Sequence, residues 1–166
     1  RIGDMTSKIM PTYNRKPGTF VRGDDVYLYD SEGNRYLDAS CGLAVTSLGH
    51  SHPLIAETIK EQSEKLIHTS NAFHIESQEM LAKRLCQLTG MENAFFCNSG
   101  AEAVEAAIKI ARKFGHDKKY RDPKIIVMTN SFHGRTMGAM SATANTLSHE
   151  AFGPILNGII RVKFND

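Results

Sequence analysis

The sequence predicts an α/β fold in which a mostly parallel sheet, flanked by helices, is preceded by an N-terminal β-hairpin segment. Three observations lead to this prediction. An apolar run at 94–97 passes through a glycine turn into an amphipathic helix over 100–114. A second apolar run at 125–129 is rich in β-branched residues, which is typical of a strand buried on both faces of a parallel sheet. Near the N-terminus, two β-rich runs flank a turn at 30–34 that contains glycine and asparagine.

The remaining elements follow from proline and glycine positions and from apolar periodicity. In chain order we expect a polar arm at 1–18, hairpin strands at 26–29 and 35–38, a helix whose first turn contains Pro53, a helix over 76–89 ended by Gly90, the helix over 100–114 ended by Gly115, and a strand at 159–162. The helix over 76–89 should turn its larger apolar residues inward: Met80, Leu81, Leu85 and Leu88.

The helix over 100–114 carries the clearest local signals, and with the apolar runs on either side it predicts a right-handed βαβ unit. Ser99 and Glu102 have the spacing of a capping box, in which a hydroxyl and a carboxylate each satisfy a free backbone amide. Glu105 and Lys109 are four residues apart, so we expect them to pair on the outer side of the helix.

The turn before this helix is a candidate anion site. A strand that enters a helix through a glycine turn aims free backbone amides, here those of Gly100 and Ala101, beyond the carboxyl end of the strand. The helix dipole favours a phosphate or carboxylate there, and Gly100 has no side chain to block its approach. The alternative, an ordinary capped helix of an α/β domain, fits these residues equally well.

A second candidate segment, residues 131–136, follows the strand at 125–129. Both segments follow predicted parallel strands, at the edge where ligands bind in open α/β sheets. Phe132 is suited to stacking on a flat heteroaromatic ring, and Arg135 to binding a carboxylate through its planar guanidinium, while His133 adds an imidazole. A packing phenylalanine and a surface arginine are the alternatives, and the position opposite the glycine turn favours a functional role.

Composition and missing motifs exclude several functions. The net charge of +2, with scattered basic residues, gives no sign of nucleic-acid binding, and no apolar run is long enough to cross a membrane. The patterns GxxxxGK[ST], GxGxxG and GxSxG are absent. His50 and His52 match no common zinc spacing, so loop packing is the better interpretation, and no metal is expected. Three cysteines, an odd number, favour a reducing compartment.

Four motifs follow one another in order over nearly the whole chain. They are Gly-Leu-Ala-Val at 42–45 leading to Leu-Gly-His-Ser-His-Pro at 48–53, His-Thr-Ser-Asn at 68–71, Asn-Ser-Gly-Ala-Glu-Ala at 98–103, and Phe-His-Gly-Arg-Thr at 132–136. With the ending at 162–166, they resemble the class III (ornithine-type) pyridoxal-phosphate aminotransferases. The segments at 48–53 and 68–71 are most similar to the acetylornithine subfamily of that class.

This resemblance implies a PLP-transferase-like fold (fold type I) and pyridoxal 5′-phosphate (PLP) as the cofactor. The implied site residues are Ser99, Gly100 and Ala101 at the cofactor phosphate, Phe132 stacked on the pyridine ring with His133 beside it, and Arg135 at the α-carboxylate of the substrate. The segments at 42–45 and 68–71 would lie near the active site, partly across a dimer interface.

The implied reaction moves the terminal amino group of N-acetylornithine to 2-oxoglutarate, a step of arginine biosynthesis. The implied partners are therefore an amino acid and a 2-oxo acid, and the full-length protein would be a cytoplasmic homodimer. Within the class, ornithine, 4-aminobutyrate and succinylornithine aminotransferases are alternatives. A non-catalytic module with the cofactor fold is an alternative from outside the class.

Two parts of the family pattern lie beyond the last residue of this sequence: the Schiff-base lysine and the acidic residue that pairs with the pyridine nitrogen. No lysine of this chain occupies a matching motif, so the resemblance assigns no catalytic residue. We expect a fragment with an incomplete sheet, which does not transaminate alone. Its parts would be an N-terminal segment at 1–70, with the arm, hairpin and linking helix, and the first part of the large cofactor-binding α/β domain at 71–166.

Overall fold

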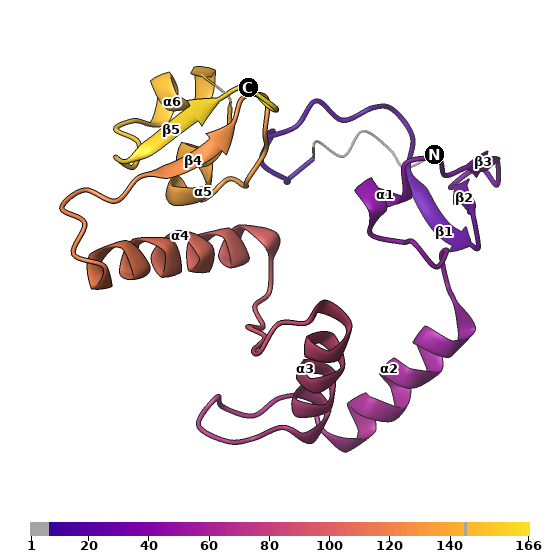
Figure 1. Ribbon diagram of the computed structural model, residues 1–166. Helices are drawn as coiled ribbons and strands as arrows, with labels where there is room; N and C mark the ends of the chain where they lie inside the picture. The colour runs from indigo at the N-terminus through magenta and orange to yellow at the C-terminus, as the bar shows by residue number, and fades with distance from the viewer. Residues whose placement is uncertain (1–6, 145) are drawn as a thin grey trace. The chain divides into compact units, whose positions relative to one another are not determined.

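A computed structural model describes residues 7–144 and 146–166 of the chain (Figure 1). Its elements are β1 (Phe20–Asp24), β2 (Tyr27–Asp30), β3 (Arg35–Leu37), α1 (Cys41–Ala44), α2 (Pro53–Lys65), α3 (Glu76–Thr89), α4 (Gly100–Asp117), β4 (Ile125–Met128), α5 (Met137–Ala142), α6 (Thr146–Phe152) and β5 (Ile159–Val162). They belong to two compact units, divided in sequence between Phe73 and His74. The division into enzyme domains after residue 70 stays a prediction. Across the described ranges, no helix is long and apolar enough to span a membrane.

The first unit contains a three-stranded antiparallel sheet in the order β1-β2-β3. The turn between β2 and β3 forms around Asp30, whose carboxylate accepts hydrogen bonds from the Glu32 and Asn34 amides at 2.9 Å each and from the Tyr36 hydroxyl at 2.9 Å. The predicted hairpin is therefore present as β2 and β3. The strand β1 was not predicted, because Arg22, Gly23 and Asp24 interrupt its β-rich pattern.

The two long helices before α4 begin and end close to the expected residues. Pro53 occupies the first turn of α2, and Gly90 ends α3 with a left-handed φ of 73°. The inward orientation predicted for the apolar residues of α3 is wrong for the described chain, in which α3 buries no residue and Met80 and Leu88 are each 66% exposed. An amphipathic helix buries its apolar face only where another element covers that face.

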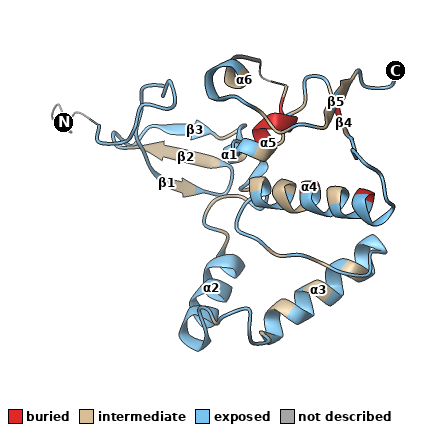
Figure 2. Cartoon of the chain, turned by 90° about the vertical axis from the view of Figure 1, so that its left-hand side faces the viewer, coloured by how far each residue is buried: buried red, intermediate tan, exposed pale blue. Residues whose placement is uncertain are grey.

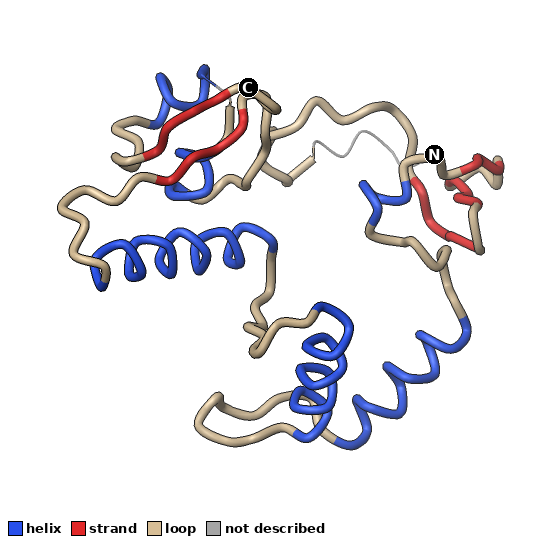
Figure 3. Tube along the Cα trace, viewed as in Figure 1, coloured by secondary structure: helices blue, strands red, loops and turns tan. Residues whose placement is uncertain are grey.

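A parallel pair of strands forms the sheet of the second unit, with Ile125 opposite Ile159 and Met128 opposite Val162. The strand predicted at 94–97 is not formed, and Figure 3 draws this stretch, directly before α4, as loop. A strand requires a ladder of hydrogen bonds to a neighbour, and no described strand pairs with 94–97. The predicted βαβ unit is therefore wrong in its first strand, whereas α4 and β4 are present.

Burial is concentrated where α5 contacts its neighbours, as the red segments in Figure 2 show. The buried apolar residues among those described are Ile108, Val127, Ala139, Met140 and Ala142. Gly115 does not end α4, contrary to the prediction, since the helix continues to Asp117. Its role is steric: a Cβ at Gly115 would lie 2.4 Å from the Cβ of Pro123, so glycine permits the close approach of the following turn.

Candidate functional site

The N-terminus of α4 forms the predicted capping box. The Ser99 hydroxyl accepts a hydrogen bond from the Glu102 amide at 3.2 Å and donates one to the Glu102 carboxylate at 3.0 Å. The same carboxylate reaches back to the Asn98 amide at 2.9 Å. The backbone amides of Gly100 and Ala101 donate no hydrogen bond to any described residue. Two amides at the positive end of the helix are therefore available to an anion.

Electrostatics at this terminus depends on Glu102. Hydrogen bonds from the Asn98 side chain and from Ser99 hold the pKa of the Glu102 carboxyl below its ordinary value. The carboxylate is therefore ionised at neutral pH and fully engaged by the residues of the cap. An anion at the two available amides would lie near this negative charge, so the amides and the helix dipole must provide the attraction.

The segment 132–136 lies against the first turn of α4. Gly134 has a φ of 134°, and a Cβ at that position would lie 3.0 Å from the Cβ of Ala101 and 3.3 Å from its Cα. A larger residue at position 134 would push the two segments apart, and its backbone would be strained at this φ value. The two segments that carry the predicted site residues therefore meet at Gly134 and Ala101.

Phe132 and Arg135 lie beside each other on this segment. The guanidinium carbon of Arg135 is 5.7 Å from the centroid of the Phe132 ring, within the range of a cation–π contact, and the Phe132 side chain is 68% exposed. They line a pocket of about 640 Å³ together with residues such as Met140 and Phe152. Gly100 is not among its lining residues, so the pocket and the helix terminus are two features that the segment 132–136 connects.

The position of His133 is set by a hydrogen bond of its backbone amide, and its ring makes one longer contact. Its amide donates to the Thr143 hydroxyl at 2.9 Å, and its Nδ1 lies 3.5 Å from the Ser131 hydroxyl. Thr143, which is buried, was not singled out from the sequence. It lies ten residues away from His133, so no local pattern could have indicated the contact.

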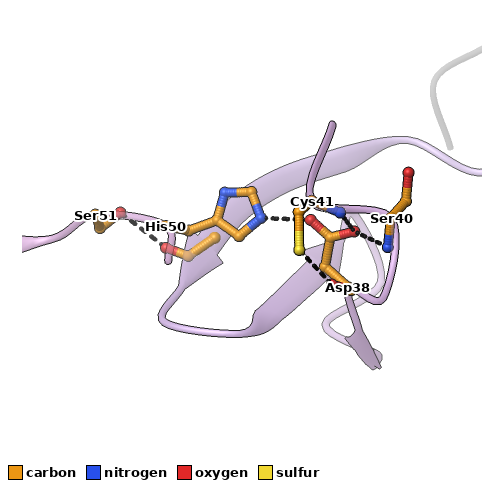
Figure 4. A network of polar contacts seen from close by, with 6 residues as sticks. Asp38, Ser40, Cys41, His50 and Ser51 are labelled. Carbon is orange, nitrogen blue, oxygen red and sulfur yellow. Dashed lines mark hydrogen bonds and ion pairs between the residues drawn. The ribbon is translucent and has the colours of Figure 1, made fainter. Parts of the chain in front are cut away.

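The first unit contains a polar network around Asp38, shown in Figure 4. The Asp38 carboxylate accepts from the Ser40 amide at 3.1 Å, the Cys41 amide at 2.9 Å and His50 Nε2 at 2.8 Å. The hydrogen bond from His50 and those from the Cys41 and Ser40 amides keep the pKa of Asp38 below its ordinary value. His50 is thus held in the loop as expected, and its ring lies against Gly23, where a Cβ would come within 2.5 Å.

This network supports a strained turn. Cys41, Gly42, Leu43 and Ala44 have φ values of 49°, 59°, 61° and 65°, so α1 is a left-handed turn with three non-glycine residues. The turn contains most of the first motif, 42–45. Its placement near an active site, like that of 68–71, stays a prediction, because both segments belong to the first unit. In the described residues no group of three or more His, Cys, Asp or Glu side chains could hold a metal ion.

Comparison with known proteins identifies the family. The family model for Aminotransferase class-III matches residues 10–166. Proteins named acetylornithine aminotransferase are 54% identical over 160 residues in Nitrosomonas europaea and 49% identical over 159 residues in Aquifex aeolicus. These alignments cover 96% and 95% of this chain, which spans 41% and 42% of the relatives' own lengths.

Solved structures agree with this result. An ornithine aminotransferase from Toxoplasma gondii matches 96% of the chain with a TM-score of 0.91 and 29% identity, and the chain covers 38% of that structure. An N-acetylornithine aminotransferase from Stenotrophomonas maltophilia matches 93% of the chain with a TM-score of 0.74 and 32% identity, and the chain covers 37% of it. The predicted fold class is confirmed, and the chain belongs to the class III aminotransferases, pyridoxal-phosphate-dependent proteins of fold type I.

Proposed function

We propose that this chain is the N-terminal part of an acetylornithine aminotransferase, which transfers the terminal amino group of N-acetylornithine to 2-oxoglutarate. The names of its relatives, at up to 54% identity, support N-acetylornithine as the amino donor. The observation that carries the proposal is the approach of Gly134 to Ala101, because it joins a helix terminus suited to phosphate to a segment with an aromatic ring and a guanidinium.

The phosphate of PLP fits the terminus of α4. Gly100 and Ala101 offer two amides without another acceptor among the described residues, and outside its chain neighbours and its own helix no described atom would lie within 4 Å of a Cβ at Gly100. In this proposal the two amides bind the phosphate. Ser99 lies beside them, and its hydroxyl would exchange its donation to Glu102 for one to the phosphate.

The segment 132–136 supplies the other contacts. Phe132, largely exposed, stacks on the pyridine ring, with His133 following it, and Arg135 binds the α-carboxylate of the substrate. PLP supplies the electron sink of the reaction when bound. The residues of this chain bind and orient, and we assign the covalent attachment of the cofactor to none of its lysines.

Turnover assays of the full-length protein test this function. We expect N-acetylornithine to be the preferred amino donor over ornithine, 4-aminobutyrate and succinylornithine, with 2-oxoglutarate as acceptor. The chain of residues 1–166 is expected to show no turnover. Absence of turnover with N-acetylornithine would reject the substrate, and absence with every donor would favour a non-catalytic module.

The proposal includes a homodimer in the cytoplasm. Exposed apolar side chains on the left-handed turn and directly after it, with Leu43 at 90% and Val45 at 79% exposure, support an interface there. Cys41, Cys86 and Cys97 are all free thiols, which supports a reducing compartment. Light scattering of the full-length protein is expected to give the mass of a dimer, and a monomer mass would contradict this part.

A further inference from the structure

Glu105 on α4 does not pair with Lys109, as its spacing predicted, but binds the segment that follows the candidate site. Its Oε1 accepts hydrogen bonds from the Thr136 hydroxyl at 2.5 Å and from the Ala139 amide at 3.2 Å. These partners lie 31 and 34 residues further along the chain. One carboxylate therefore joins α4 to α5 and to the segment before it.

The first turn of α5 is built around this carboxylate. Thr136 is the N-cap of α5, and its hydroxyl also accepts from the Ala139 amide at 3.3 Å. Glu105 thus gives the Ala139 amide a second acceptor, from another helix, beside the hydroxyl of its own N-cap. Gly138 makes room for it, because a Cβ there would lie 2.5 Å from Oε2 of Glu105. A larger residue at 138 would displace the carboxylate.

The segment with Arg135 is held at both ends. At its start, the His133 amide donates to the Thr143 hydroxyl, which is buried. At its end, Glu105 binds Thr136, the residue next to Arg135. Arg135 lies between these two anchored points, and its exposed side chain places the guanidinium carbon 5.7 Å from the centroid of the Phe132 ring.

We propose that Glu105 is a positioning residue that sets the place of the Arg135 guanidinium and, through it, the affinity for the substrate carboxylate. The inference rests on the proposed function, in which Arg135 binds that carboxylate. Removal of the acceptor at 105 frees Thr136 and the first turn of α5, and Arg135 then samples positions that do not match the substrate.

Steady-state kinetics of the full-length protein tests the proposal with three variants. Glu105→Ala is expected to raise KM for both N-acetylornithine and 2-oxoglutarate about tenfold or more, with kcat changed less than about threefold. Glu105→Gln keeps an acceptor oxygen and is expected to stay within about threefold of the wild type in KM. Lys109→Ala, the matched control on the same helix, is expected to leave both constants unchanged. Wild-type KM values in Glu105→Ala would overturn the proposal.

A double variant separates positioning from a general loss of structure. If Glu105 acts through Arg135, Glu105→Ala has no further effect on KM in a protein that already carries Arg135→Ala. If the fold-change in KM of the double variant equals the product of the fold-changes of the two single variants, Glu105 acts independently of Arg135, and the proposal is overturned.

Hydrogen exchange of the backbone makes the test independent of the substrate. Glu105→Ala is expected to speed exchange of the Ala139 amide, and an unchanged rate would refute the contact.

If the wild type does not accept N-acetylornithine, only the proposed substrate is rejected, and the role of Glu105 is still tested. KM is then measured with the amino donor that the protein does accept, and the same tenfold rise is expected.

Discussion

The absence of a side chain at Gly100 leaves space for a ligand at the start of α4 and is not needed for packing within the fold. Outside its own helix and its chain neighbours, no described atom lies within 4 Å of the position that a Cβ would take. A larger side chain therefore fits the fold. It would nevertheless occupy space beside the amides of Gly100 and Ala101, where the proposed phosphate approaches the backbone.

We predict that Gly100→Val folds with little change in melting temperature but binds PLP at least about tenfold more weakly, because the branched side chain keeps the phosphate from the two amides. Titration of the full-length protein, freed of cofactor, measures this affinity by absorbance. Gly100→Ala, with a smaller side chain, should show a smaller loss. Equal affinity in all three proteins would contradict the phosphate site.

Asp38 links pH to the stability of the first unit. Its pKa is lowered in the folded chain, so the folded state holds the ionised carboxylate more strongly than the unfolded chain does. The stabilisation is fully present above the unfolded pKa of about 3.9 and is lost as the pH falls through the lower folded value. Protonation would remove the acceptor shared by His50 and the amides of Ser40 and Cys41.

We therefore predict that Asp38→Asn lowers the free energy of unfolding at pH 7 and weakens its dependence on pH below about 4. Urea unfolding followed by circular dichroism at pH 7, 5 and 3 measures both effects. Asp24→Asn is a suitable control, because the Asp24 side chain is well exposed and its ion pair among the described residues is with Arg22. The same pH dependence in wild type and Asp38→Asn would count against this role.

Among the elements, α4 has the best-defined beginning. Its Ser99 cap accepts a hydrogen bond from Glu102, whereas Ser40, at the corresponding position of α1, makes no side-chain capping hydrogen bond. The two serines therefore provide a useful comparison, because Ser99 caps an α-helix and Ser40 precedes a left-handed turn without a capping contact.

Replacement of Ser99 by alanine is expected to cost about 1 kcal/mol of unfolding free energy, and Ser40→Ala less than about 0.5 kcal/mol. Urea unfolding of the two variants beside the wild type gives both values. An equal cost at the two positions would mean that the capping hydrogen bond at Ser99 contributes nothing measurable.

The outcomes for α4 show what a sequence reveals about an element. Its start was predictable, because Ser99 and Glu102 are neighbours in sequence and in space. The reason for a glycine at 115 was not, since the contact it permits is with Pro123, in the turn beyond the helix. Glu105 fails the local prediction for the same reason: its partners come from a distant segment. The capped start of α4 was predictable, and the anchoring of the segment 132–136 through Glu105 and Thr143 was not.

At the scale of the whole molecule, much apolar surface has no cover in the described chain. On α3, α4 and β4 respectively, Leu88 is 66%, Ile110 66% and Ile126 61% exposed. The strand predicted at 94–97 likewise has no partner among the described strands. A periodic or β-rich sequence pattern shows that a segment has an apolar face, but it does not show which other segment covers that face. The chain spans about 41% of its relatives, and under the proposed function the rest of the enzyme covers these faces.

We predict that residues 1–166, produced alone, bind the dye ANS several-fold more strongly per molecule than the full-length protein does, since ANS reports exposed apolar surface. Fluorescence titration at equal molar concentration measures the ratio. A ratio near one would show that the apolar faces of α3 and β4 are covered without additional chain, and would contradict the role given to the rest of the enzyme.

The left-handed turn at 41–44 has a consequence for how this region tolerates mutation. The left-handed conformation of Leu43 and Ala44 costs roughly 1–2 kcal/mol of conformational free energy at each residue, whereas glycine adopts it readily. In a saturation library selected only for folded protein, glycine should be enriched at these two codons, opposite to its usual depletion from helices. Selection for catalysis would then reveal whether evolution kept leucine and alanine there for their side chains.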